Sequence, residues 1–251
     1  MAVSIEAETH VGMSFGPGMF TDEEFEKVAH EVLQPDITEY EYFVESHGTK
    51  FYRKYIEDAG LYEYKIHGVM EDMDPELCAQ VYVDWEYRKK WDNYTMDLHL
   101  VRNESTDVDG LYWCVDYPWP MSDRDYTFIR DMKIMEIGGK KTWVVLAKFY
   151  EFPCKPEKNG VIRVTELKQA CVMQSDGKVG AKAFMYYYDN PKGMIPTWLI
   201  NWAAKTGVPM FMSNMKDAVS RYKNFLEEKR KELGLEQLNN EERLKNLYKV
   251  K

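Results

Sequence analysis

Residues 196–231 constrain the fold most, because they predict a long helix with a nearly continuous apolar face. A turn-rich segment precedes them, and Pro196 or Thr197 can begin the helix, since proline is tolerated in a first helical turn. Pro209 lacks a backbone donor and crowds the preceding turn. The sequence therefore predicts one kinked helix or two abutting helices, with the interruption at Gly207-Val208-Pro209.

Methionines and tryptophans gather in and beside this stretch: Met194, Met210, Met212, Met215, Trp198 and Trp202. Methionine has flexible torsions and a polarizable sulfur, which suit a wall against a flexible apolar molecule. On composition alone, the simpler interpretation is an ordinary C-terminal helix packed on a sheet. The segments before the helix bear on this choice.

Those segments predict a large antiparallel sheet with few helices. A capping box at Thr21–Glu24 begins a helix that ends near Gln34, Asp74-Pro75 begins a short helix through Val83, and another covers roughly 85–94. The fold class is α+β, with the terminal helix covering the concave face of a strongly curved sheet of about nine strands. A helix gripped in such a curve can leave a long internal cavity. The predicted strands are 39–46, 50–56, 61–70, 97–103, 110–117, 125–137, 141–152, 160–175 and 178–189.

Length and charge limit the organisation and the partners. A chain of 251 residues allows one large domain or two small ones, and no linker divides it. We expect a flexible leader at 1–20, one folded domain at 21–228, and a charged helical or disordered tail at 229–251. The net charge of −9 argues against a nucleic-acid partner, because no overall basic surface exists.

Cysteine usage and the lack of targeting signals predict a cytoplasmic protein. The four cysteines, Cys78, Cys114, Cys154 and Cys171, are far apart and lie in or beside apolar runs, which predicts buried free thiols in a reducing compartment. The N-terminus does not match a signal peptide, and no apolar run reaches the roughly 18 residues that a membrane span needs. We expect a monomer.

A search for catalytic and metal-binding motifs identifies none. There is no G-x-S-x-G motif, no phosphate-binding glycine loop and no dinucleotide-binding fingerprint, and the five histidines lack ligand spacing. We therefore expect no cofactor, no metal and no enzymatic activity.

Arg88 and Asp92 form the first candidate binding element. On a helix they are four residues apart and can pair directly, and the simplest interpretation is a surface salt bridge. The neighbouring residues argue against this interpretation, because so many aromatic side chains are unusual in a solvent-exposed turn. They are Trp85, Tyr87, Trp91 and Tyr94. A buried arginine held by one aspartate can bind a phosphate group with its remaining donors.

A second aromatic cluster lies between residues 112 and 126. It includes Trp113, Tyr117, Trp119 and Tyr126, and taken alone these rings are core residues of two strands and a proline loop. Aromatic rings also bind quaternary ammonium groups. Together with Arg88, the cluster offers the parts for a zwitterion that carries a phosphate and an ammonium group.

Five runs in matching order resemble the START lipid-transfer family. They are LYEYKIHGVMED (61–72), YRKKWDNY (87–94), YPWPMSDRDY (117–126), NGVIRV (159–164) and FMYYYDNPKGMIPTWLINWAAKTGVP (184–209). The resemblance covers about residues 21–226. It implies a helix-grip fold with one phospholipid in an internal tunnel that the C-terminal helix closes. Phosphatidylcholine is the phospholipid that the resemblance implies first.

The resemblance also implies roles for particular residues. Arg88 would bind the lipid phosphate, Asp92 would hold Arg88, and Tyr82 would be a further phosphate contact. Trp113 and Tyr126 match two walls of the family's choline cage, whereas the third wall, a tyrosine in the family, is Leu167 here. Leucine offers contact area without a ring quadrupole, so phosphatidylethanolamine is an alternative ligand.

The predicted lid and membrane gate consists of residues around the helix interruption: Trp198, Trp202, Val208, Pro209, Met210 and Met215. We expect it to contact a membrane surface transiently as lipid enters. The predicted function is extraction of one glycerophospholipid from a membrane and delivery to another. The alternatives are a binder of a sterol or other apolar ligand, for which Arg88–Asp92 is only structural, and a small-molecule lyase or cyclase.

Overall fold

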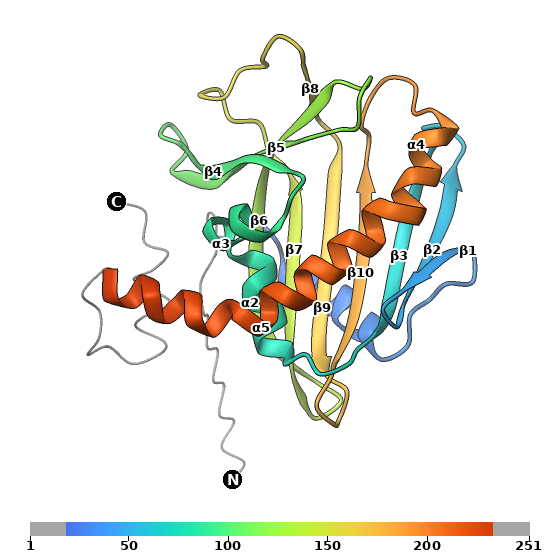
Figure 1. Ribbon diagram of the computed structural model, residues 1–251, viewed down its shortest axis with the longest axis vertical. Coiled ribbons are helices and arrows are strands. Elements are labelled where there is room, and N and C mark those ends of the chain that lie inside the picture. The colour runs from blue at the N-terminus through green and yellow to red at the C-terminus, as the bar shows by residue number, and fades with distance from the viewer. Residues whose placement is uncertain (1–18, 233–251) are drawn as a thin grey trace.

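The computed structural model describes residues 19–232 of the chain (Figure 1). Its helical elements are α1 (Asp22–Ala29), the 3₁₀ turn η1 (His30–Val32), α2 (Pro75–Val83), α3 (Trp85–Trp91), α4 (Thr197–Trp202), the π-helical segment η2 (Ala203–Gly207) and α5 (Val208–Glu232). Its strands are β1 (Glu41–Ser46), β2 (Thr49–Ile56), β3 (Leu61–Met70), β4 (Thr95–Asn103), β5 (Val108–Val115), β6 (Asp123–Ile137), β7 (Lys140–Phe149), β8 (Val161–Val164), β9 (Leu167–Ser175) and β10 (Ala181–Asp189).

The strands form one curved sheet in the order β1-β2-β3-β10-β9-β7-β6-β5-β4, and all pairs along this path are antiparallel. The short strand β8 lies off the path and pairs with β6 in parallel. Helix α5 crosses the concave face of the sheet diagonally, and α1 lies behind the sheet (Figure 1). The predicted α+β architecture with a terminal helix over the concave face is therefore confirmed.

Each face of the sheet has its own hydrophobic core. The inner core joins α2, α3 and α5 to the concave face, and the outer core joins α1 and η1 to the convex face. Strand β7 serves both cores, because Val144 faces the outer one and Val145 the inner one. A strand covered on both faces needs apolar residues at successive positions, which explains why this part of β7 does not alternate.

Asp84 fixes the position of α3 on the inner face. One oxygen of its buried carboxylate accepts the backbone N–H of Tyr87 at 2.8 Å and so caps the helix. The other oxygen accepts the hydroxyl of Tyr222 on α5, also at 2.8 Å. The Tyr87 hydroxyl in turn donates to the Ala218 carbonyl at 2.9 Å. These three hydrogen bonds hold α3 against the middle of α5.

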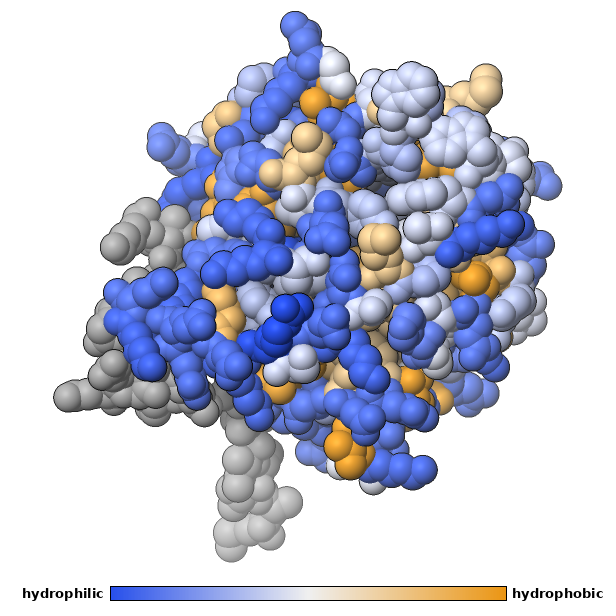
Figure 2. All heavy atoms as spheres, viewed as in Figure 1, coloured by the Kyte–Doolittle hydropathy of each residue, from blue (hydrophilic) through white to orange (hydrophobic). Residues whose placement is uncertain are grey.

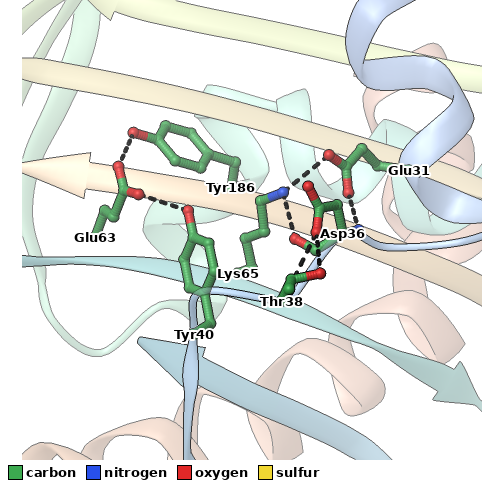
Figure 3. Close-up of polar contacts among 7 residues, drawn as sticks. All are labelled: Glu31, Asp36, Thr38, Tyr40, Glu63, Lys65 and Tyr186. Atoms are coloured by element: carbon green, nitrogen blue, oxygen red, sulfur yellow. Dashed lines mark hydrogen bonds and ion pairs between the residues drawn. The ribbon is translucent and has the colours of Figure 1, made fainter. Parts of the chain in front are cut away.

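A polar cluster on the convex face attaches the segment between η1 and β1 to the sheet (Figure 3). Glu63 accepts the hydroxyls of Tyr40 at 2.6 Å and Tyr186 at 2.8 Å, and Lys65 donates to Glu31 at 2.9 Å. These partly buried groups satisfy one another. We assign the cluster a structural role, because it lies on the face opposite the inner core.

Two expected elements differ in the structure. The predicted strand 160–175 is two strands, because β8 pairs with β6 whereas β9 pairs with β7 and β10. One straight strand cannot satisfy both sets of partners. The predicted helix through Gln34 is α-helical only to Ala29 and ends in the 3₁₀ turn η1.

The predicted interruption near Gly207-Val208-Pro209 is a π-helical segment, η2, which ends at Gly207 and joins α4 directly to α5. The Val208 N–H bonds the Ala203 carbonyl, so the turn holds one extra residue. Pro209 follows directly after this wide turn, at the second position of α5, and supplies no N–H to the helix. Gly207 packs against Trp202, and a Cβ atom there would lie 3.2 Å from the nearest atom of the indole ring.

The terminal regions and the cysteines also require corrections. Phe20, expected in the flexible leader, is buried and packs edge-on against Phe25 at 6.2 Å. The rest of the predicted leader (1–18) and most of the predicted tail (233–251) lie outside the described residues. All four cysteines are free, and three are buried as expected, but Cys154 is exposed because it lies in the loop that follows β7.

Candidate binding site

Arg88 lies on α3 and faces the inner core rather than solvent. Its Nε donates to Asp92 Oδ2 at 2.9 Å, and the two side chains are only 14% and 2% exposed. Asp92 also accepts the backbone N–H of Tyr94 at 3.2 Å, so its carboxylate is fixed from two directions. Within residues 19–232 the Arg88 side chain donates through Nε, and neither terminal nitrogen donates to a protein acceptor. Arg88 therefore keeps two positively charged donors for another group.

Aromatic rings surround the guanidinium of Arg88. Its Cζ lies 4.9 Å from the ring centroid of Trp113 and 5.6 Å from those of Trp91 and Phe211. These rings come from α3, β5 and α5, so the site forms only when the helices pack on the sheet. The rings limit solvent access to the cation, which strengthens its attraction for an anion. The surface salt bridge that the spacing alone favoured is thus a half-buried pair.

Trp113 continues into a row of rings along the sheet. It pairs directly with Tyr126 across β5 and β6, and the ring centroids are 5.2 Å apart with an interplanar angle of 32°. Its indole N–H donates to Thr95 Oγ1 at 2.9 Å, which fixes the ring orientation. The Tyr126 hydroxyl donates to Asp189 Oδ2 at 2.8 Å. The structure therefore brings the two predicted cage rings into contact.

Asp189 at the end of β10 is a site residue that the sequence analysis missed. It lies directly opposite Leu167 on β9 and on the same face as Tyr187, whose hydroxyl also bonds its carboxylate. Burial raises the pKa of Asp189 above its usual range, although the two tyrosine hydrogen bonds oppose this. The alternation Tyr187-Tyr188-Asp189 was a usable signal, since it places Tyr187 and Asp189 together. The predicted strand 178–189 ended at Asp189, but no role in the site was expected for this residue.

Tyr82 and Leu167 are both buried in the inner core. The Tyr82 hydroxyl donates to Gln169 Oε1 at 3.4 Å, a long hydrogen bond between α2 and β9. Burial raises the pKa of Tyr82, and the charges of Arg88 and Arg130 oppose the shift. Leu167 is 3% exposed and lies beside Asp189 on the same face of the sheet, as its cross-strand partner.

The predicted lid residues divide into surface and core. Trp198 and Met210 are exposed by 42% and 41%, whereas Trp202, Val208 and Pro209 are half-buried. Met215 is only 4% exposed and belongs to the inner core. Tyr94 connects the lid to α3, because its ring packs edge-on against Trp202 at 5.7 Å and its hydroxyl lies 3.4 Å from the Met210 sulfur.

The site thus carries opposite charges at the two ends of an aromatic row. Arg88 contacts Trp113, Trp113 contacts Tyr126, and Tyr126 bonds Asp189. Within residues 19–232 no group of three His, Cys, Asp or Glu side chains is placed to hold a metal ion, and none of the helices there is long and apolar enough to cross a membrane. The arrangement can bind a molecule with an anionic and a cationic group but offers no nucleophile paired with a base.

Comparison with known proteins defines the class. Residues 39–224 match the family model of the START domain, and this chain belongs to the START family. The fold agrees: the crystal structure of human STARD10 superposes with a TM-score of 0.69 at 20% identity over 87% of each chain. Human StAR-related lipid transfer protein 5 gives a TM-score of 0.62 at 17% identity, over 80% of this chain and 97% of the other.

Particular relatives are more similar in sequence. The phosphatidylcholine transfer protein of Bos taurus is 46% identical over 213 residues, which cover 84% of this chain and 99% of that protein. The phosphatidylcholine transfer protein of Homo sapiens is 44% identical over 212 residues, covering 84% and 98%. The mitochondrial StAR-related lipid transfer protein 7 of Mus musculus is 28% identical over 179 residues, covering 70% and 48%.

Proposed function

We propose that this protein binds one glycerophospholipid between its sheet and its C-terminal helix and transfers it between membranes. The observation that carries the proposal is the half-buried Arg88, whose two terminal nitrogens point to no partner among residues 19–232 and face aromatic rings. A phosphodiester offers two oxygens that match these donors. Asp92 holds the guanidinium for this contact, and the Tyr82 hydroxyl would contact the same phosphate.

The acyl chains are proposed to lie in the inner core. Ala183, Met185, Tyr187, Phe211 and Met212 all pack against this core, yet each is only half-buried. Residues between a sheet and its covering helix are normally sealed, because interiors pack as densely as organic crystals. Their remaining exposure supports an internal space with apolar walls. Flexible methionine side chains let such walls adapt to chains of different shape.

Phosphatidylcholine is the ligand that we propose first. The relatives that carry this lipid's name share 44–46% identity with the chain over most of its length. Trp113 and Tyr126 bring two adjacent aromatic rings to this part of the site, and such rings attract a quaternary ammonium group. Leu167 replaces a ring at the third wall, which makes phosphatidylethanolamine the second ligand to test.

The membrane-facing end is proposed to be the one at which α4 lies. Arg124 ties the β5–β6 loop to the β10–α4 loop, because its guanidinium donates to the carbonyls of Ser122, Pro191 and Lys192. These loops carry two highly exposed apolar residues, Trp119 at 90% and Met194 at 86%. In Figure 2, less hydrophilic residues gather at this end, whereas hydrophilic residues surround the far end of α5. The π-helical segment between α4 and α5 is the point at which the lid would bend.

Native mass spectrometry of the purified protein, before and after incubation with vesicles of phosphatidylcholine, phosphatidylethanolamine and cholesterol, tests the proposal. We expect one bound phospholipid per chain. Recovery of cholesterol alone, or of no lipid after incubation, would contradict it. Hydrogen exchange with and without the same vesicles tests the lid, for which we expect altered protection at residues 202–215. Unchanged exchange there in a protein that still transfers lipid would exclude this gate.

A further inference from the structure

Asp189 is a carboxylate in an aromatic environment without a cationic partner. Within residues 19–232 it forms no ion pair, and its hydrogen bonds come from the uncharged hydroxyls of Tyr126 and Tyr187. Arg124 is near enough to lower its pKa, but the three donors of Arg124 go to backbone carbonyls. An incompletely compensated charge in such a site is costly unless a cation arrives. The protein keeps a cation-seeking group at this position.

The position of Asp189 relative to Arg88 indicates which ligand group its carboxylate could bind. The two lie at opposite ends of the row formed by Trp113 and Tyr126, with 4.9 Å from the guanidinium to the first ring and 5.2 Å between the rings. The Tyr126 hydroxyl is 2.8 Å from Asp189. A phosphate at Arg88 would therefore direct the rest of a headgroup along the rings toward the carboxylate. The charges of the site therefore complement those of a zwitterionic headgroup, with cationic Arg88 at the phosphate and anionic Asp189 at the ammonium group.

Building on the proposed function, we propose that Asp189 is the counter-ion for the ammonium group of the bound phospholipid and makes the protein select zwitterionic over anionic headgroups. The carboxylate attracts a trimethylammonium group through charge alone and a primary ammonium group through charge and hydrogen bonding. It therefore accepts both phosphatidylcholine and phosphatidylethanolamine. Phosphatidylglycerol brings no cation, so its binding leaves Asp189 without a compensating charge.

Leu167 strengthens the case for this role. It lies directly across from Asp189 on β9 and presents no ring to the ligand. A site with fewer rings retains less cation–π attraction, whereas a carboxylate attracts ammonium over a longer distance. Selection in this protein would thus depend more on charge than on ring count. Asp189 is a specificity-determining residue in this proposal, separate from the phosphate contact at Arg88.

Competition among lipids tests the proposal. The full-length protein is incubated with vesicles of equal parts phosphatidylcholine, phosphatidylethanolamine and phosphatidylglycerol, and the bound lipids are counted by native mass spectrometry. Asp189→Asn removes the charge and keeps an acceptor for the tyrosine hydroxyls. Glu166→Gln is the matched control, because Glu166 is an exposed carboxylate that accepts hydrogen bonds from Tyr188 and Asn190 nearby.

We expect Asp189→Asn to lower the ratio of zwitterionic to anionic lipid by about tenfold, which is ~1.4 kcal/mol, while Glu166→Gln and Asp189→Glu retain the ratio. If Asp189→Asn does not fold by circular dichroism, Asp189→Ser provides a smaller neutral replacement. An unchanged ratio in the folded neutral variant overturns the role of Asp189 and leaves phospholipid transfer standing. Failure of the unmodified protein to bind any of the three lipids overturns the proposed function itself.

Discussion

Asp125 and Tyr126 are neighbours on β6, yet they belong to two regions that handle charge differently. On one side of the strand, Asp125 forms a bidentate pair with Arg163 at 2.7 and 2.9 Å, and Arg163 Nη1 bonds the Lys155 carbonyl at 3.0 Å. On the other side, Tyr126 connects Arg88 to Asp189 through the aromatic row. The charges of the first region satisfy each other. In the second region Arg88 bonds Asp92 through Nε alone, and Asp189 forms no ion pair within residues 19–232. We propose that a buried arginine serves structure or ligand binding according to which of its donors remain unused.

The largest expected effect is a loss of stability on breaking the Asp125–Arg163 pair. Arg163→Ala leaves Asp125 buried without a cation and should lower the free energy of unfolding by about 3–5 kcal/mol. Urea denaturation measures it. Arg102→Ala is the matched control, because Arg102 is 49% exposed and pairs with Asp107 and Asp109 on the surface. The control should cost under about 1 kcal/mol. Equal losses in both variants would contradict the structural role of Arg163.

Acidification should weaken the binding of zwitterionic lipids, because it protonates Asp189. Burial raises the pKa of Asp189, and a bound ammonium group favours its ionised form, so binding releases a proton. Affinity should therefore fall as the pH drops below this raised pKa, by up to about tenfold per pH unit.

The neighbours of Asp189 do not produce this change. Tyr126, Tyr187, Tyr117 and Tyr64 have raised pKa values and stay neutral in acid, and Arg124 stays charged. Asp189→Asn should flatten the acid limb of the profile, because the group with the raised pKa is then absent. A profile that the substitution leaves unchanged would assign the titration to another group.

A smaller effect on headgroup preference is expected at Leu167, the cross-strand partner of Asp189. A well-placed ring contributes about 0.5–2 kcal/mol to binding of a quaternary ammonium group. Leu167→Tyr should therefore sharpen the preference for phosphatidylcholine over phosphatidylethanolamine by a few-fold. Competition binding with both lipids measures the ratio, and Leu167→Met controls for a change of shape without a ring. No shift in the ratio would indicate that Tyr187 or another ring already completes the cage.

The sequence predicts the elements whose signals are local. The strand at 61–70 and the helix that Asp74 caps were placed correctly, because alternation and capping depend on nearby residues. The split between β8 and β9 could not be predicted, since it depends on parallel pairing with β6. The π-helical segment depends likewise on how Trp202 packs against Gly207.

The candidate site was predictable in part for the same reason. The Arg88–Asp92 pair follows from helical spacing, and its burial was suggested by the surrounding rings. Which donors of Arg88 stay unused depends on α5 and β5, which approach from distant parts of the chain. A site role for Asp189 was not predicted, because an aspartate before Asn-Pro is typical of a turn. Only the folded sheet places it beside Tyr126.

The measurement that tests the central claim most directly is phosphatidylcholine transfer between vesicles by Arg88→Ala, compared with Lys89→Ala. Lys89 is exposed on the same helix, so its substitution removes an equal charge without touching the aromatic row. Hydrogen bonds to charged groups contribute about 1.5–3 kcal/mol each, and loss of two should reduce transfer by more than about a hundredfold. Circular dichroism checks that the protein remains folded. We predict that Arg88→Ala nearly abolishes transfer while Lys89→Ala retains it. Equal transfer by both variants and the unmodified protein would contradict the assignment of Arg88 as the phosphate-binding residue.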